Sequence, residues 1–221
     1  MHLHIFSFEQ RSGFNAAYQG FLALRKQKLV DELGWGLDHD GTFEQDQYDR
    51  PGAVYSIVTQ GSRVVAGARA ASCGGSDGYW SYMLKDARDG KIQGIPGGLL
   101  SAYPETGRTW ECTRFVMDET LADTAQPSIE TKLVVAGLCQ AAFSLGASEM
   151  MSLSPRSLGL LLRRFGYSVR REAVRYICED DGREYRSFLM ACDPAVNQDL
   201  AAFYLSPVSQ FGPLHELQGA A

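Results

Sequence analysis

Several residue types and motifs that build common functional sites are scarce in this sequence. It has only four histidines in 221 residues, so a metal centre or a Ser-His-Asp triad would have little material. Its five cysteines are odd in number and show no C-x-x-C spacing, which disfavours a disulfide framework or a zinc site and fits a reducing cytosol. The G-x-G-x-x-G and Walker A patterns are absent, so we do not expect a doubly wound nucleotide-binding fold.

Positive charge and long apolar runs are scarce as well. The net charge of −5 disfavours nucleic-acid binding, which needs a basic face. No apolar run approaches the length of a membrane span, and residues 1–8 lack the basic start and apolar stretch of a signal peptide. We therefore expect a cytoplasmic protein without a membrane span or a metal, folded as one domain over 1–221 with a flexible tail at 206–221.

The sequence does contain alternating helical and strand patterns. Apolar residues recur at helical spacing over 14–33 and 127–145, which predicts two long helices. Short strand-like runs are expected near the start and over 54–59, 63–71, 110–116, 150–153, 174–178 and 185–191. This order predicts an α/β fold, a three-layer α/β/α sandwich with a mostly antiparallel central sheet.

The loop after the first predicted helix is rich in carboxylates. Glu44, Asp46 and Asp49 lie within six positions. One interpretation is a solvated acidic loop. The other is a cradle for a cationic ligand, since carboxylates bind ammonium or sulfonium groups by charge and hydrogen bonding. Trp35 and Tyr48 lie nearby in the sequence and could cover such a cation with aromatic faces.

Two predicted strands carry charged residues among apolar ones. Arg69 lies in a strand of small apolar residues, so it needs a partner if it is buried, from the acidic loop or from a substrate. Glu111 and Arg114 share a later strand and could form an internal ion pair or belong to a site. Strict alternation would place these two on opposite faces, whereas a β-bulge would bring them to one side.

In order and spacing, these residues resemble the signature of the LuxI-type acyl-homoserine lactone synthases. The matching residues are Arg25, Trp35, Asp46-x-x-Asp49, Arg69 and the run Glu111-Cys112-Thr113-Arg114-Phe115. Leu29 stands where the family usually has phenylalanine. The resemblance covers roughly residues 3–193 and implies a fold similar to the GNAT acetyltransferases.

The resemblance also implies a reaction. An acyl group would pass from acyl carrier protein or acyl-CoA to the amine of S-adenosylmethionine, and lactone closure would release methylthioadenosine and yield a quorum-sensing signal. S-adenosylmethionine is then a substrate, and no cofactor is implied. The implied catalytic residues are Glu111, Arg114 and Arg69, with Glu111 as the general base. The residues implied to bind S-adenosylmethionine are Arg25, Trp35, Asp46, Asp49, Thr113 and Phe115.

A pocket for the acyl chain is implied as well. Its candidate lining residues are Met83, Leu84, Leu100, Met150, Ser152, Ser154 and Leu158. A hydroxyl of Ser152 or Ser154 could contact an oxygen on the third acyl carbon. N-capping of the helix that begins at Pro155 is the alternative role for Ser154.

Two features bear on the acyl donor. The usual GNAT pyrophosphate loop, R/Q-x-x-G-x-G/A, is absent, which favours a carrier-protein donor over CoA. Five arginines between positions 156 and 171 form a basic cluster that could dock an acidic carrier protein or could be a solvated face. Two other functions stay open: N-acylation of another amine without lactone formation, and a catalytically silent GNAT-like binding module.

Overall fold

A seven-stranded sheet forms the centre of the computed structural model, which describes residues 1–121, 129–209 and 211. Its strand order is β1-β2-β3-β4-β5-β7-β6, and every neighbouring pair is antiparallel except β4 and β5. The strands are β1 (His2–Ser7), β2 (Ala53–Gln60), β3 (Arg63–Ser72), β4 (Thr109–Met117), β5 (Glu149–Pro155), β6 (Val169–Ile177) and β7 (Glu184–Ala191). The predicted α/β fold with a mostly antiparallel sheet is confirmed.

The helices agree broadly with the predicted ones. They are α1 (Asn15–Arg25), α2 (Met83–Arg88), α3 (Ile129–Ser144), α4 (Arg156–Arg164) and α5 (Gln198–Tyr204), with shorter turns at Phe8–Phe14, Lys26–Glu32 and Glu119–Leu121. The predicted helix over 14–33 is α1 continued by a π-helical turn. The helix predicted over 127–145 is α3, and residues 127 and 128 lie outside the described ranges, as does most of the expected tail at 206–221.

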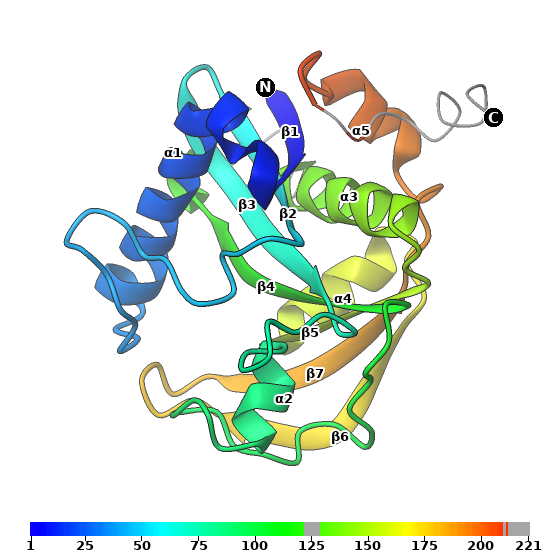
Figure 1. Cartoon of the computed structure of the whole chain (residues 1–221). Helices are drawn as coiled ribbons and strands as arrows, with labels where there is room; N and C mark the ends of the chain where they lie inside the picture. The colour runs from blue at the N-terminus through cyan, green and yellow to red at the C-terminus, as the bar shows by residue number, and fades with distance from the viewer. Residues whose placement is uncertain (122–128, 210, 212–221) are drawn as a thin grey trace.

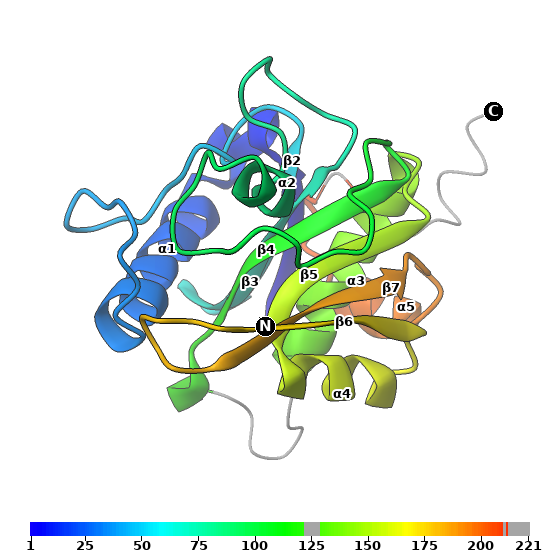
Figure 2. The same cartoon turned by 90° about the horizontal axis from the view of Figure 1, so that it is seen from below.

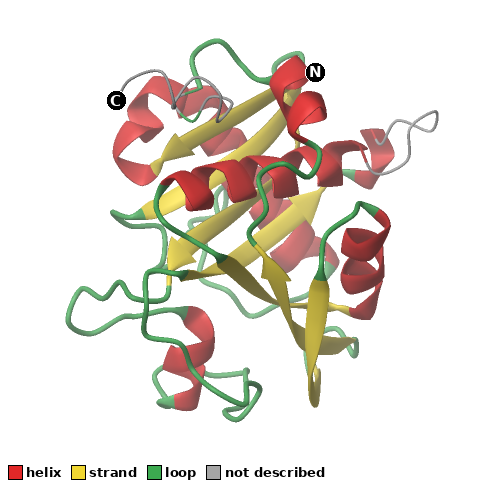
Figure 3. Cartoon of the chain, turned by 90° about the vertical axis from the view of Figure 1, so that its right-hand side faces the viewer, coloured by secondary structure: helices red, strands yellow, loops and turns green. Residues whose placement is uncertain are grey.

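Apolar cores on both faces make the sheet the middle of three layers. On one face, α1 packs Phe21 and Leu22 against Ile57 of β2. On the other face, α3 packs Leu133 and Val134 against the sheet. Figure 1 shows α1 on the left of the sheet and α3 and α5 on the right, and Figure 3 looks onto the right-hand side, where helices lie in front of the strands. None of the helices in the described ranges combines the length and the apolar character that crossing a bilayer requires.

The sheet divides between β4 and β5. The two strands pair only over 109–111 and 149–151, and beyond these positions they separate. A wedge therefore opens between the half of the sheet built from β1–β4 and the half built from β5–β7. Parallel strands that splay in this way expose the side chains of both edges to the space between them.

The start of α4 differs from the prediction. β5 continues through Pro155, which takes the N-cap position, so α4 begins at Arg156. Ser154 lies in the strand, and its hydroxyl contacts that of Ser152 at 3.1 Å. The predicted N-cap role of Ser154 is therefore wrong, because Pro155 is the N-cap residue and the Ser154 hydroxyl bonds to Ser152 and not to the first turn of the helix.

Candidate active site

Two buried arginines hold the acidic loop against the sheet. Arg25, in the last turn of α1, donates hydrogen bonds to Glu44 and, at 2.9 Å, to both oxygens of Asp49. Arg69 of β3 pairs with Asp46 at 2.5 Å and with Asp49 at 2.8 Å. Both arginine side chains are at most 1% exposed. The loop is thus not a solvated acidic loop, because its carboxylates are buried in ion pairs.

Arg114 adds the third guanidinium and reaches the same carboxylates from β4. Its Nε lies 3.2 Å from Glu44, and its Nη2 lies 2.8 Å from Asp46. Three arginines and three carboxylates therefore meet, and their formal charges cancel. About a tenth of the Asp46 and Arg114 side chains is exposed, whereas Asp49 is enclosed. Asp46 and Arg114 are the edge of this network that a ligand can touch.

The arginines keep the loop carboxylates ionised. Burial by itself would raise the pKa of Asp46, but Arg69 and Arg114 hold that pKa well below its usual range. Burial likewise opposes ionisation of Asp49, and Arg69 and Arg25 lower its pKa. A network that is charged and fixed before ligand binding is suited to orient a polar substrate.

A β-bulge in β4 places its charged residues on one face. Arg69 pairs with Thr113 and Gly67 pairs with Val116, so the two residues Arg114 and Phe115 lie opposite one residue of β3. Arg114 adopts a left-handed backbone conformation with φ of 56°. The bulge therefore resolves the alternatives that the sequence left open, since it turns Arg114 to the face that carries Arg69 and Thr113.

Glu111 lies on this face but apart from the ion pairs. Its two carboxylate oxygens accept the backbone N–H groups of Met83 at 2.7 Å and Leu84 at 2.9 Å. Burial raises the pKa of Glu111 to about 7, against the opposing effect of these two N–H groups. None of the ion pairs among the described residues includes Glu111, so it does not pair with Arg114.

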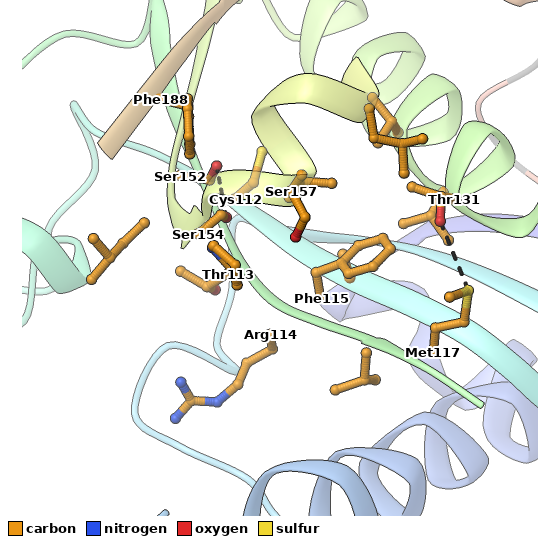
Figure 4. A pocket seen from close by; sticks show the side chains of 18 of the residues that line it. Cys112, Thr113, Arg114, Phe115, Met117, Thr131, Ser152, Ser154, Ser157 and Phe188 are labelled. Atoms are coloured by element: carbon orange, nitrogen blue, oxygen red, sulfur yellow. Dashed lines mark hydrogen bonds between the residues drawn. The ribbon is translucent and has the colours of Figure 1, made fainter. Parts of the chain in front are cut away.

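A cleft of about 670 Å³ fills the wedge between β4 and β5, a size typical of small-molecule sites. Its walls include Phe115, Met150, Leu158 and Phe188, which make it largely apolar. Part of one wall of the cleft carries hydroxyl groups, which belong to Thr113, Ser152, Ser154 and Ser157. Figure 4 shows the Phe115 ring pointing into the cleft. The Arg114 side chain points away from these four hydroxyl groups.

The structure separates the residues expected to line the acyl pocket. Met150, Ser152, Ser154 and Leu158 line the cleft. Met83, Leu84 and Leu100 do not line it; they pack in a different apolar cluster, of which Met151 reaches the cleft. That cluster includes the first two residues of α2 and lies on the opposite face of β5 from Met150.

The residues expected to bind S-adenosylmethionine, together with the two arginines expected to act in catalysis, Arg69 and Arg114, fall into two groups. Trp35, Thr113, Arg114 and Phe115 line the cleft. The others do not line it: Arg25, Asp49 and Arg69 are buried behind Arg114 and Thr113, and Asp46 lies beside Arg114 with about a tenth of its side chain exposed. Arg69 connects the two groups, since it also donates to the Thr113 hydroxyl at 3.0 Å.

Two residues that contribute to this arrangement were not among the site residues predicted from the sequence, although Glu44 was considered as one carboxylate of the acidic loop. Glu44 bridges Arg25 and Arg114. Its spacing of two positions from Asp46 could have indicated this, because residues two apart in extended backbone lie on one side. Asp181 accepts the indole N–H of Trp35 at 3.0 Å. No signal marked it, since Asp-Gly at 181–182 is an ordinary hairpin turn in sequence.

Comparison with known proteins then decides the family. A family model described as autoinducer synthase matches residues 9–193. The chain belongs to the autoinducer synthase family. An acyl-homoserine-lactone synthase from Ralstonia nicotianae is 31% identical over 147 residues, which cover 64% of this chain and 67% of the relative. Membership confirms the resemblance and the expected activity, that of an acyltransferase of the acyl-homoserine-lactone synthase type.

Solved structures show the same fold. TofI in a ternary complex with an inhibitor and MTA superposes with a TM-score of 0.68 at 20% identity, covering 94% of this chain and 98% of that one. BjaI, a CoA-dependent acyl-homoserine lactone synthase with SAM and isopentyl-CoA, gives a TM-score of 0.69 at 16% identity, covering 93% and 92%. The GNAT-like sandwich of the autoinducer synthases is therefore the fold of this chain.

Proposed function

We propose that this autoinducer synthase acylates the amine of S-adenosylmethionine and then closes the product to a lactone with release of methylthioadenosine. One observation carries the proposal: the exposed edge of a charge-neutral ion-pair network, Asp46 and Arg114, adjoins an apolar cleft. The ion-pair edge suits a zwitterionic amine substrate, and the apolar cleft beside it suits an acyl chain. The related structures with MTA, and with SAM and isopentyl-CoA, support the same pair of substrate classes.

The network would bind S-adenosylmethionine through its two exposed groups. Asp46 faces the cationic part of the substrate, and Arg114 binds its carboxylate. Arg25, Asp49 and Arg69 keep these two groups in place from behind. The aromatic faces of Trp35 and Phe115 line the cleft and suit the sulfonium.

Glu111 would serve as the general base. The amine nitrogen attacks the thioester carbonyl carbon, its proton passes to Glu111, and the carbon–sulfur bond breaks to release a thiolate, which takes that proton and leaves as the thiol. A pKa of about 7 suits a group that accepts a proton at neutral pH. Because Glu111 does not line the cleft, a water molecule is expected to carry the proton between them. An oxygen of the substrate carboxylate then attacks the chain carbon that carries the sulfonium, a C–O bond forms, and the C–S bond breaks so that the sulfur leaves in neutral methylthioadenosine.

Backbone donors for the oxyanion would come from the β-bulge. A bulge sets two residues against one on the partner strand, and here Arg114 and Phe115 both lack a register partner on β3. An N–H group that is not used by β3 is free to stabilise the tetrahedral intermediate. The acyl chain would lie against Met150, Leu158 and Phe188, with Ser152 and Ser154 near an oxygen on its third carbon.

Acyl carrier protein is the proposed donor. The GNAT pyrophosphate loop is absent, and the five exposed arginines of α4 and β6 offer a basic surface to an acidic carrier. CoA dependence of BjaI makes acyl-CoA the alternative. The five arginines are Arg156, Arg163, Arg164, Arg170 and Arg171.

One experiment tests both the reaction and the donor. The purified protein is given S-adenosylmethionine with octanoyl carrier protein or with octanoyl-CoA, and methylthioadenosine and lactone are measured by mass spectrometry. We expect the two products in equal amounts and faster with the carrier protein. An N-acyl product of another amine without methylthioadenosine would contradict the reaction, and equal or faster turnover of octanoyl-CoA would contradict the donor.

A further inference from the structure

A side-chain contact joins the two halves of the divided sheet. Trp35 follows α1 and its π-helical turn, which pack on the β1–β4 half. Asp181 lies in the turn between β6 and β7, on the other half. The indole Nε1 donates to Asp181 Oδ2 at 3.0 Å across 146 positions of the sequence. Figures 1 and 2 both show the β6–β7 turn reaching towards the segment after α1.

The same carboxylate oxygen also binds the aromatic partner of Trp35. The Tyr185 hydroxyl donates to Asp181 Oδ2 at 2.6 Å, and the two rings meet edge to face with centroids 6.0 Å apart. The other oxygen, Oδ1, accepts the backbone N–H of Arg183 at 2.9 Å, which fixes the carboxylate in the turn. Asp181 therefore holds two aromatic rings in one geometry, and both rings line the cleft.

We propose that Asp181 is a positioning residue that fixes the Trp35 indole against Tyr185, so that the two rings form a rigid aromatic wall for the cationic amine substrate. The identity of that substrate rests on the proposed function, whereas the contact itself does not. Asp181 does not line the cleft and so acts through the rings and not by touching the substrate. A pre-ordered aromatic surface stabilises a cation without losing side-chain entropy on binding.

The decisive comparison is between Asp181→Ala and Asp180→Ala. Asp180 is the neighbouring carboxylate in the same turn and is exposed, so its variant controls for loss of charge and for turn effects. The indole N–H signal of Trp35, assigned with Trp35→Phe, should shift upfield and exchange faster with water in Asp181→Ala only. The KM for S-adenosylmethionine should rise roughly tenfold in the same variant, the size expected for loss of hydrogen bonds to a charged acceptor, with kcat within about twofold.

Coupling to Trp35 separates this role from a general structural one. In a background that carries both Trp35→Phe and Tyr185→Phe, Asp181→Ala should add no further rise in KM, because both side-chain donors to Asp181 Oδ2 are already gone. Asp181→Asn keeps an oxygen acceptor and should give a rise of about threefold. The proposal is overturned if Asp181→Ala matches Asp180→Ala in signal and KM, if it lowers kcat instead, or if its effect on KM persists in the background that lacks both the Trp35 indole and the Tyr185 hydroxyl.

Two further results have a defined meaning: a variant that does not fold, and a wild-type protein without activity. If Asp181→Ala does not fold, Asp181→Asn decides, and wild-type values of KM and of the indole signal in that variant would overturn the proposal. If the wild-type protein releases no methylthioadenosine with either donor, the proposed function fails. The position and solvent exchange of the Trp35 signal then still decide whether Asp181 fixes the indole.

Discussion

The Arg114 guanidinium lies 2.8 Å from the Asp46 carboxylate because the backbone of Arg114 is left-handed. With φ of 56°, this residue follows Thr113 on the same face of β4 and does not alternate to the other one. A left-handed residue other than glycine costs roughly 1–2 kcal/mol. The strain persists because the ion pairs with Asp46 and Glu44 offset it, and it sits beside the cleft where a strained residue has a use.

This geometry predicts an inverted order of stability at Arg114. Glycine normally destabilises a strand relative to alanine, by roughly 0.5–1 kcal/mol. At a positive φ, Arg114→Gly should instead be more stable than Arg114→Ala by about 1 kcal/mol in urea unfolding. Both variants should lose most S-adenosylmethionine binding. An Arg114→Ala protein as stable as the glycine variant would contradict the left-handed conformation.

Glu44 should be essential to the network although it does not line the cleft. Glu44→Gln leaves Arg25 and Arg114 with one carboxylate fewer in a buried site, so we expect a loss of about 3 kcal/mol in unfolding free energy. Asp38→Asn, an exposed change in the preceding segment, should have almost no effect. Equal urea midpoints for the two variants would show that Glu44 contributes nothing to the network.

Activity should depend on ionisation of Glu111. Its pKa is about 7, so kcat/KM should rise through that pH as the carboxylate forms and then level off. Glu111→Gln should lower kcat by a factor of roughly 10² or more while S-adenosylmethionine still binds. The surface variant Glu105→Gln should keep the wild-type pH profile. A Glu111→Gln protein with normal kcat would exclude the residue as the base.

Ionisation of Glu111 should lower the unfolding free energy, although it should raise activity. The pKa of Glu111 is raised above its ordinary value of 4.5, so the folded state binds more protons than the unfolded state between about pH 4.5 and 7. Unfolding free energy due to this group therefore falls as pH rises through that window. The difference between wild type and Glu111→Gln, measured by urea unfolding at several pH values, should show this fall; a difference that does not change with pH contradicts it.

Gly159 should influence which acyl chains are accepted. A Cβ at this position would lie 2.3 Å from the Phe188 ring, which lines the cleft. Gly159→Ala should push the ring into the cleft, cost about 1–3 kcal/mol of stability, and favour shorter acyl chains. Adding Phe188→Leu should restore longer chains. Product profiles with C4, C8 and C12 thioesters measure this, and an unchanged profile in Gly159→Ala would place the acyl chain elsewhere.

Sequence patterns predicted the fold more completely than the site. Periodicity located most strands and helices, because burial of one face is recorded in the spacing of apolar residues. The pairing within the network was not predictable, since three carboxylates in one loop and three distant arginines permit several pairings. Met83, Leu84 and Leu100 were assigned to the acyl pocket because apolar side chains carry no mark of which core they enter; in the structure they pack in the apolar cluster that contains the start of α2.

The short pairing of β4 with β5 also separates the residues proposed to bind the amine substrate from those proposed to contact the acyl chain. Residues of the ion-pair network come from α1, the acidic loop, β3 and β4, all before the split, whereas Met150, Leu158 and Phe188 come after it. Changes in the later part of the chain can therefore alter the acyl tail of the signal without disturbing the part that makes its ring. Under our assignment of substrates, related proteins with this architecture can evolve signals with different acyl chains while they keep the same lactone-forming reaction.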